Sequence, residues 1–139
     1  RGLGDVYKRQ GYDISIEENG RTGRKPLHWE YLDNADRKGL HDVYAALMKL
    51  RNAHPELFDA NATLTWKVET SDWDNGRTLL VKSITGKQLV VVGNFTHTAT
   101  DIVFPATPGN WTNYFTGKSE TVNKQVNVPA HGYVVYTNF

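Results

Sequence analysis

The sequence predicts a mainly β protein, a Greek-key antiparallel β-sandwich of about seven to eight strands preceded by an irregular loop and one amphipathic α-helix. After Pro55, short β-branched and aromatic runs alternate with turn residues, which is typical of an antiparallel sandwich or barrel. Before Pro55, one stretch repeats apolar residues at helical spacing. The 139 residues have room for one compact domain, or for one domain with an attached segment.

The first part of the chain has no regular period. We interpret residues 1–10 as a non-native junction run, because they start at Arg1 rather than Met and show no strong hydrophobic pattern. Residues 11–36 carry turn formers at Asn19-Gly20 and Thr22-Gly23, and Lys25-Pro26 disfavours a helix. This segment is predicted to be a long loop.

One amphipathic helix is predicted from Asp36 to the His54-Pro55 pair, which would end it. Asp33, Asn34 or Asp36 could cap its start. Its length is about four turns, and an isolated helix of this length is marginal in water. Its apolar stripe therefore needs a partner, and it consists of Leu40, Val43, Tyr44, Leu47, Met48 and Leu50.

The rest of the chain reads as short strands separated by turns such as Asp74-Asn75-Gly76 and Thr116-Gly117-Lys118. Leu89 to Val92 are all apolar, which favours a central strand, whereas the alternation in residues 123–128 favours a strand with one face in water. The predicted strands are 63–69, 77–84, 88–95, 100–104, 111–115, 119–122, 125–128 and 133–137.

Composition excludes several classes of site. The formal net charge of +1 gives no field toward nucleic acid, and no apolar run is long enough for a membrane helix. Without cysteine there are no disulfides and no thiol nucleophiles. The five histidines are scattered, and Asp72-x-Asp74 lacks the later ligand spacing of a calcium loop, so we expect a hairpin turn there and no metal site in this stretch.

Three features follow each other in a specific order: the segment Arg24-Lys25-Pro26-Leu27-His28-Trp29, a helix containing Leu50-Arg51, and a β-domain closing with Val128-Pro129-Ala130-His131-Gly132. In this order they resemble the α-amylase family of glycoside hydrolases. There, an R-x-P-x-x-W segment follows the eighth strand of a catalytic (β/α)8 barrel, the last barrel helix often ends in Leu-Arg, and an all-β domain C closes with an apolar-Pro-Ala-x-Gly motif. The resemblance covers Gly11 to Phe139.

The resemblance implies a parent enzyme that hydrolyses internal α-1,4-glucosidic bonds of starch or glycogen with retention. Residues 11–55 would be the last barrel loop and helix, and residues 56–139 would be domain C, packed against the missing barrel. Retaining enzymes need a nucleophile and an acid/base carboxyl group roughly 5 Å apart. The family motifs that supply them, G-x-R-x-D, an isolated Glu and N-H-D, do not occur here. We therefore assign no catalytic residue and expect this stretch to be inactive structural support.

Contact with an α-glucan is expected through the loop that resembles the eighth barrel loop, where Tyr12, Asp13 and Arg21 are the candidate binding residues. Bracing of the loop against the barrel is the alternative for its arginines. No cofactor is expected in this stretch, although the parent could bind calcium through upstream loops.

The aromatic residues of the β region suggest a rival function, a stand-alone carbohydrate-binding module. Its surface platform would be Trp73, Trp111 and Tyr114. Trp66 is in phase with Leu64 and Val68 and is predicted to lie in the core. We also expect Trp29 to be a packing residue. A sandwich that only binds another protein is the third possibility.

Overall fold

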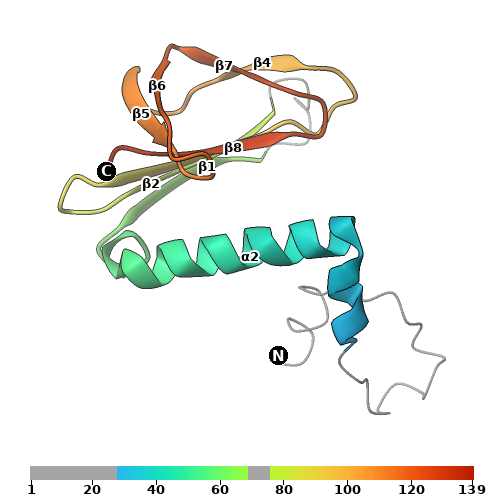
Figure 1. Cartoon of the computed structure of the whole chain (residues 1–139). Helices are drawn as coiled ribbons and strands as arrows, with labels where there is room; N and C mark the ends of the chain where they lie inside the picture. The colour runs from blue at the N-terminus through green and yellow to red at the C-terminus, as the bar shows by residue number, and fades with distance from the viewer. Residues whose placement is uncertain (1–27, 69–75) are drawn as a thin grey trace. The chain divides into compact units, whose positions relative to one another are not determined.

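The computed structural model describes residues 28–68 and 76–139. The chain divides into two compact units, Arg1–Ala53 and His54–Phe139. Within the described residues, the first unit contains the 3-10 helix η1 and the helix α2, and the second contains the 3-10 helix η2 and eight strands (Figure 1). No helix in the described ranges is long and apolar enough to cross a membrane.

The first unit contains η1 (Trp29–Asp33) and α2 (Ala35–Ala53). Asn34 begins the helix, because its side-chain Oδ1 accepts hydrogen bonds from the backbone N–H groups of Asp36 (3.0 Å) and Arg37 (3.1 Å). Of the three predicted caps, Asn34 is therefore the one used. The 19 residues make about five turns, one more than predicted, and the helix ends before His54-Pro55, as expected.

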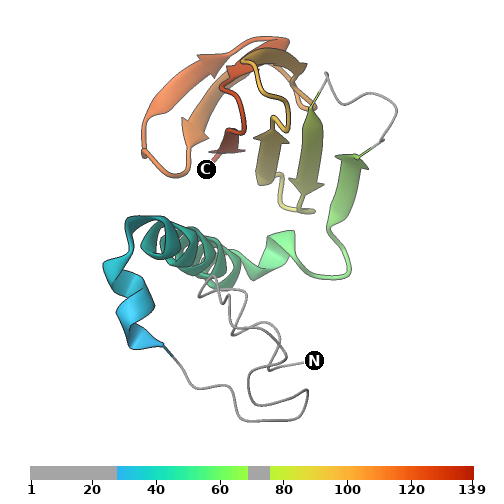
Figure 2. The ribbon, with the colours of Figure 1, turned by 90° about the vertical axis from the view of Figure 1, so that its right-hand side faces the viewer.

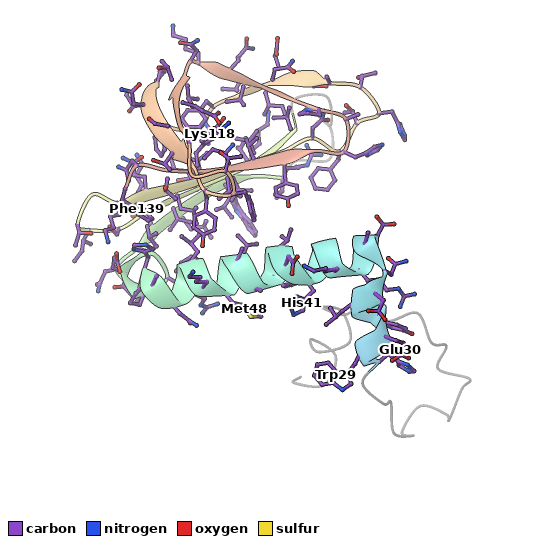
Figure 3. All side chains as sticks on the ribbon, in the orientation of Figure 1. Trp29, Glu30, His41, Met48, Lys118 and Phe139 are labelled. Atoms are coloured by element: carbon purple, nitrogen blue, oxygen red, sulfur yellow. The ribbon has the colours of Figure 1, made fainter. Side chains whose placement is uncertain are left out.

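The apolar stripe of α2 is largely exposed. Leu50 is the buried residue of the helix, whereas Leu40, Tyr44 and Leu47 stand exposed. Met48 and His41 project from one side of the helix (Figure 3).

Trp29 contradicts its predicted packing role, since 70% of its surface is exposed. None of the five residues of η1 is buried, so this 3-10 helix as a whole lies at the surface of the described part of the chain.

All eight predicted strands are present, and the three last ones have the predicted bounds. β2 ends at Lys82 because Ser83 closes a turn, donating its N–H to the Lys87 carbonyl oxygen (2.9 Å). The third strand likewise ends at Gly93 instead of Phe95. The strands are β1 (Thr63–Lys67), β2 (Arg77–Lys82), β3 (Gln88–Gly93), β4 (Thr100–Val103), β5 (Gly109–Asn113), β6 (Ser119–Val122), β7 (Gln125–Val128) and β8 (Tyr133–Thr137), and η2 (Pro55–Leu57) precedes them.

The strands form an antiparallel Greek-key sandwich with two layers (Figure 1). One sheet has the order β1-β2-β3-β8-β5-β6, and the other consists of β4 and β7. The pairs β3–β8, β4–β7 and β5–β6 are nested in the sequence, so each later pair forms inside the loop that the earlier one closes. The turned view in Figure 2 shows the strands of the larger sheet side by side.

The main core lies between the two sheets. It is built from Leu80, Val90, Val92 and Tyr136 of the larger sheet, which face Ile102 and Val128 of the smaller one. We call this side of the six-stranded sheet its inner face. β3 is a central strand, as predicted, and β7 alternates between exposed and buried residues, also as predicted.

Candidate functional site

Several residues predicted to form a site lie outside the described part of the chain. Tyr12, Asp13 and Arg21, the predicted glucan contacts, fall in residues 1–27, and Trp73 falls in residues 69–75. The Asp72-x-Asp74 pair also falls there. The predictions made for these residues therefore stay predictions.

Trp111 is not a surface platform residue, which corrects the prediction. Only 5% of its surface is exposed, and its indole packs edge-on against Phe104 with ring centres 5.2 Å apart. The indole Nε1–H donates to the Thr107 carbonyl oxygen at 3.1 Å. Because Trp111 lies on β5 facing the second sheet, it is a core residue with a satisfied polar atom.

Tyr114, the remaining member of the predicted platform, is half-buried and belongs to a chain of aromatic rings. Its ring contacts Phe115 edge-on at 5.7 Å, and Phe115 contacts Tyr133 in the same way at 5.6 Å. The three rings connect the end of β5 with the start of β8. Tyr114 is therefore next to an aromatic surface, different from the predicted platform, that was not predicted from the sequence.

This second surface is the outer face of the six-stranded sheet, opposite the core. Trp66 lies on it with 66% of its surface exposed, which contradicts its predicted place in the core. The predicted phase was right, because Leu64 and Val68 are exposed as well. The error was the face: Trp66 pairs with Leu79, and Leu79 pairs with Val91, on the side that the small sheet does not cover.

A hollow of about 310 Å³ opens on the outer face. Its position follows from the strand register, since Arg77, Gly93 and Tyr133 are direct neighbours across β2, β3 and β8. Gly93 leaves room for the ring of Phe95, whose Cε2 lies 3.3 Å from where a Cβ would be. We call this site the aromatic hollow, and it is lined by Trp66, Val68, Arg77, Thr78, Leu79, Val91, Gly93, Phe95 and Tyr133.

The chemistry of the aromatic hollow is that of a contact surface. Of the described residues that line it, Arg77 alone is charged, and its Nη1–H donates to the Gly76 carbonyl oxygen at 2.7 Å. None of the described residues that line it has a carboxyl group that could act as nucleophile or general acid, as glycoside hydrolysis requires. Large rings around an apolar floor suit another apolar surface or the flat face of a sugar.

The ionisable groups with shifted pKa values lie elsewhere. Lys87 donates to Glu56 at 2.7 Å, and this hydrogen bond is the main reason why the pKa of Glu56 falls to about 2. His54 Nδ1 lies 3.4 Å from the same carboxylate, and its ring contacts that of Phe139 at a tilt of 51°, with ring centres 4.2 Å apart. Burial, together with the hydrogen bond to Glu120 at 2.7 Å, raises the pKa of Tyr136 to about 12. Both arrangements join separate elements, so they are suited to holding the fold together.

Nothing in the sequence had indicated the aromatic hollow directly, but one signal was present. The central strands are apolar in both phases, as in Leu79-Leu80 and Val134-Val135, and this predicts a sheet covered on both faces.

Comparison with protein-family models and with curated proteins finds no match to this chain.

Proposed function

We propose that this chain is the C-terminal part of a starch- or glycogen-degrading α-amylase, in which the sandwich supports the catalytic barrel of the parent enzyme. The order of motifs along the sequence supports this proposal. Its last motif, Val128-Pro129-Ala130-His131-Gly132, forms the turn from β7 to the central strand β8, with Gly132 N–H donating to Pro129 O at 2.9 Å. A motif that shapes the entry to a central strand is expected to serve the fold rather than the reaction.

The outer face of the sheet is the observation that carries the supporting role. Trp66, Phe95 and Tyr133 expose large rings around the aromatic hollow. Contiguous exposed apolar surface on a soluble domain indicates a surface that another protein part covers. A neighbouring catalytic domain in the same polypeptide would cover it permanently, which explains why such a surface is tolerated.

The proposal divides the chemistry between the two parts of the parent enzyme. The barrel would supply the nucleophile and the acid/base carboxyl group, held close enough for retention. The described part of this chain would supply a rigid surface, and its loop residues Tyr12, Asp13 and Arg21 would contact the α-glucan at the barrel rim. The 139-residue chain alone would then have no hydrolase activity.

The first experiment is to sequence the source DNA upstream of the codon for Gly11 and to express the complete reading frame. We expect barrel strands with G-x-R-x-D, a catalytic Glu and N-H-D, and endo-hydrolysis of amylose by the complete protein but not by this chain. The matched control is the complete protein with the Asp of the G-x-R-x-D motif changed to Asn. An open reading frame that starts close to Arg1, or one without these motifs, would refute the proposal.

The exposed Trp66 favours a second candidate, a carbohydrate-binding module. A flat indole that lines the same hollow as the ring of Tyr133 could stack on glucose rings. Retention of the 139-residue chain on insoluble starch, lost in Trp66→Ser and kept in His41→Asn, would support this candidate. The α-amylase proposal instead predicts that any retention is the same in Trp66→Ser as in the original chain, because the hollow would be a domain interface rather than a sugar site.

A further inference from the structure

The fold brings together two histidines that are 34 residues apart in the sequence. His97 lies in the connection from β3 to β4, and His131 lies in the turn from β7 to β8. Because β3 pairs with β8 and β4 pairs with β7, both connections are at the same end of the sandwich. His131 Nε2 is 3.0 Å from His97 Nδ1, and the rings are almost perpendicular with centres 4.7 Å apart.

Asn94 holds the two loops in place. Its side chain is 2% exposed, and its amide N–H groups donate to the carbonyl oxygens of Val128 (2.9 Å), Pro129 (3.1 Å) and Thr98 (2.8 Å). Its Oδ1 accepts from Thr96 N–H at 2.9 Å.

The backbone connects the loops as well. Asn94 N–H donates to Gly132 O at 2.9 Å, and His131 N–H donates to Thr96 O at 3.2 Å. The two imidazoles therefore stand on a braced frame, although both are exposed.

The backbone of His131 is unusual. Its φ is +53°, and it is the one residue other than glycine with positive φ in the described ranges. Glycine adopts this conformation without steric cost, and histidine and asparagine adopt it more readily than most other residues. A non-glycine residue held there by its surroundings is a reason to ask what its side chain does.

We propose that His97 and His131 chelate a divalent transition-metal ion such as Zn²⁺ or Cu²⁺. A metal about 2.0–2.1 Å from each nitrogen, at an angle between 90° and tetrahedral, requires the two nitrogens to be about 2.9–3.4 Å apart. The observed 3.0 Å meets this requirement, and imidazole is a preferred ligand of both ions. Without metal, one imidazole N–H donates to the lone pair of the other ring.

The site would have two protein ligands and open positions. No cluster of three or more His, Asp or Glu side chains suited to a metal occurs in residues 28–68 and 76–139, so water completes the coordination. Binding should be weaker than at a closed four-ligand zinc site. The inference does not depend on the proposed function, because the histidine pair uses different residues from the aromatic hollow.

Calorimetric titration of the untagged 139-residue chain with ZnCl₂ at neutral pH tests the proposal. We expect one site in the original chain and in His41→Asn, the control on helix α2. In His97→Asn and His131→Asn the affinity for Zn²⁺ should fall at least about tenfold. Loss of a residue that only hydrogen-bonds to a metal ligand already weakens metal binding by about that factor, and here a ligand itself is lost. Asn tolerates positive φ, so His131→Asn should keep the turn, and His131→Gly provides a second variant with the same expectation.

Electron paramagnetic resonance with one equivalent of Cu²⁺ adds a direct count of ligands. Coupling to two imidazole nitrogens, reduced to one or none in each single variant, would support chelation. Equal Zn²⁺ affinity in the original chain, His97→Asn and His131→Asn would overturn the proposal. So would the absence of binding in an original chain whose circular dichroism shows a folded β protein.

Discussion

The two faces of the six-stranded sheet carry similar apolar residues but differ in what covers them. On the inner face, Leu80, Val90 and Val92 are buried beneath the small sheet. On the outer face, Trp66, Leu79 and Val91 are neighbours across β1, β2 and β3, and the Trp66 indole at the end of this row is exposed. The comparison teaches that alternation assigns residues to faces, whereas burial depends on the element that lies above each face.

The outer face is itself divided into two ends. Near the turn that joins β2 and β3, Val81 and Leu89 are buried opposite each other. At the other end, the aromatic hollow leaves Trp66, Phe95 and Tyr133 exposed. The exposed aromatic end is therefore the part of the outer face that remains available for contact.

The largest expected effect is on the inner face, where Trp111→Ala should lower the free energy of unfolding by about 4 kcal/mol. The change removes a buried indole and its hydrogen bond to Thr107 and leaves a cavity beside Phe104. Urea unfolding followed by circular dichroism measures the loss. Trp111→Phe is the matched control and should lose less than half as much. Equal stabilities for Trp111→Ala and the original chain would contradict the assignment of the core.

Next in size is Gly76→Ala, which should destabilise the sandwich by roughly 3 kcal/mol. Gly76 has a φ of +67°, and a Cβ there would be 2.7 Å from the carbonyl oxygen of Gly93 and would clash with the side chain of Ile102 in the core. Gly117 has the same φ but open space around it. Gly117→Ala should therefore cost only about 1 kcal/mol. If thermal and urea unfolding show the same loss for both, contact at Gly76 is not the cause.

Much of the fold could be predicted from the sequence, because local signals determine it. Turn residues such as Gly86 and Gly117 stand where strands end, and Asn34 and Pro55 mark the limits of the helix region. The candidate site could not be predicted in the same way. Trp66 lies in an alternating apolar run with Leu64 and Val68, whereas Trp111 is flanked by polar residues. Trp111 is nevertheless the buried one, because it packs against Phe104 in the core between the sheets.

A smaller effect concerns the covered end of the outer face, where Glu56 precedes buried Leu57 and pairs with Lys87. The folded pKa of Glu56, about 2, is below its ordinary value of 4.5. The ion pair therefore stabilises the fold above about pH 4.5, and this contribution disappears as the pH falls toward 2. Glu56→Gln should lower the free energy of unfolding at pH 6 and have little effect at pH 2.

The matched control makes the same substitution at a lysine outside this ion pair. Lys87→Met should show the same pH dependence as Glu56→Gln, whereas Lys118→Met, on the turn between β5 and β6 (Figure 3), should not. Urea unfolding at a series of pH values makes the comparison. A loss for Glu56→Gln that is independent of pH would mean that packing, rather than charge, is responsible.

The smallest expected effect is that of Trp66→Ser, which should change the stability of the 139-residue chain by no more than about 0.5 kcal/mol. The indole is exposed, so removing it leaves no cavity. In the complete protein the same substitution should be costly, by about 3 kcal/mol, if a catalytic domain covers the aromatic hollow. Urea unfolding of both proteins therefore distinguishes a surface that is exposed in use from one that is exposed only when the chain is separated from its partner. Equal, small effects in both would leave the face free for sugar, whereas a large loss restricted to the complete protein would identify it as an interface between domains.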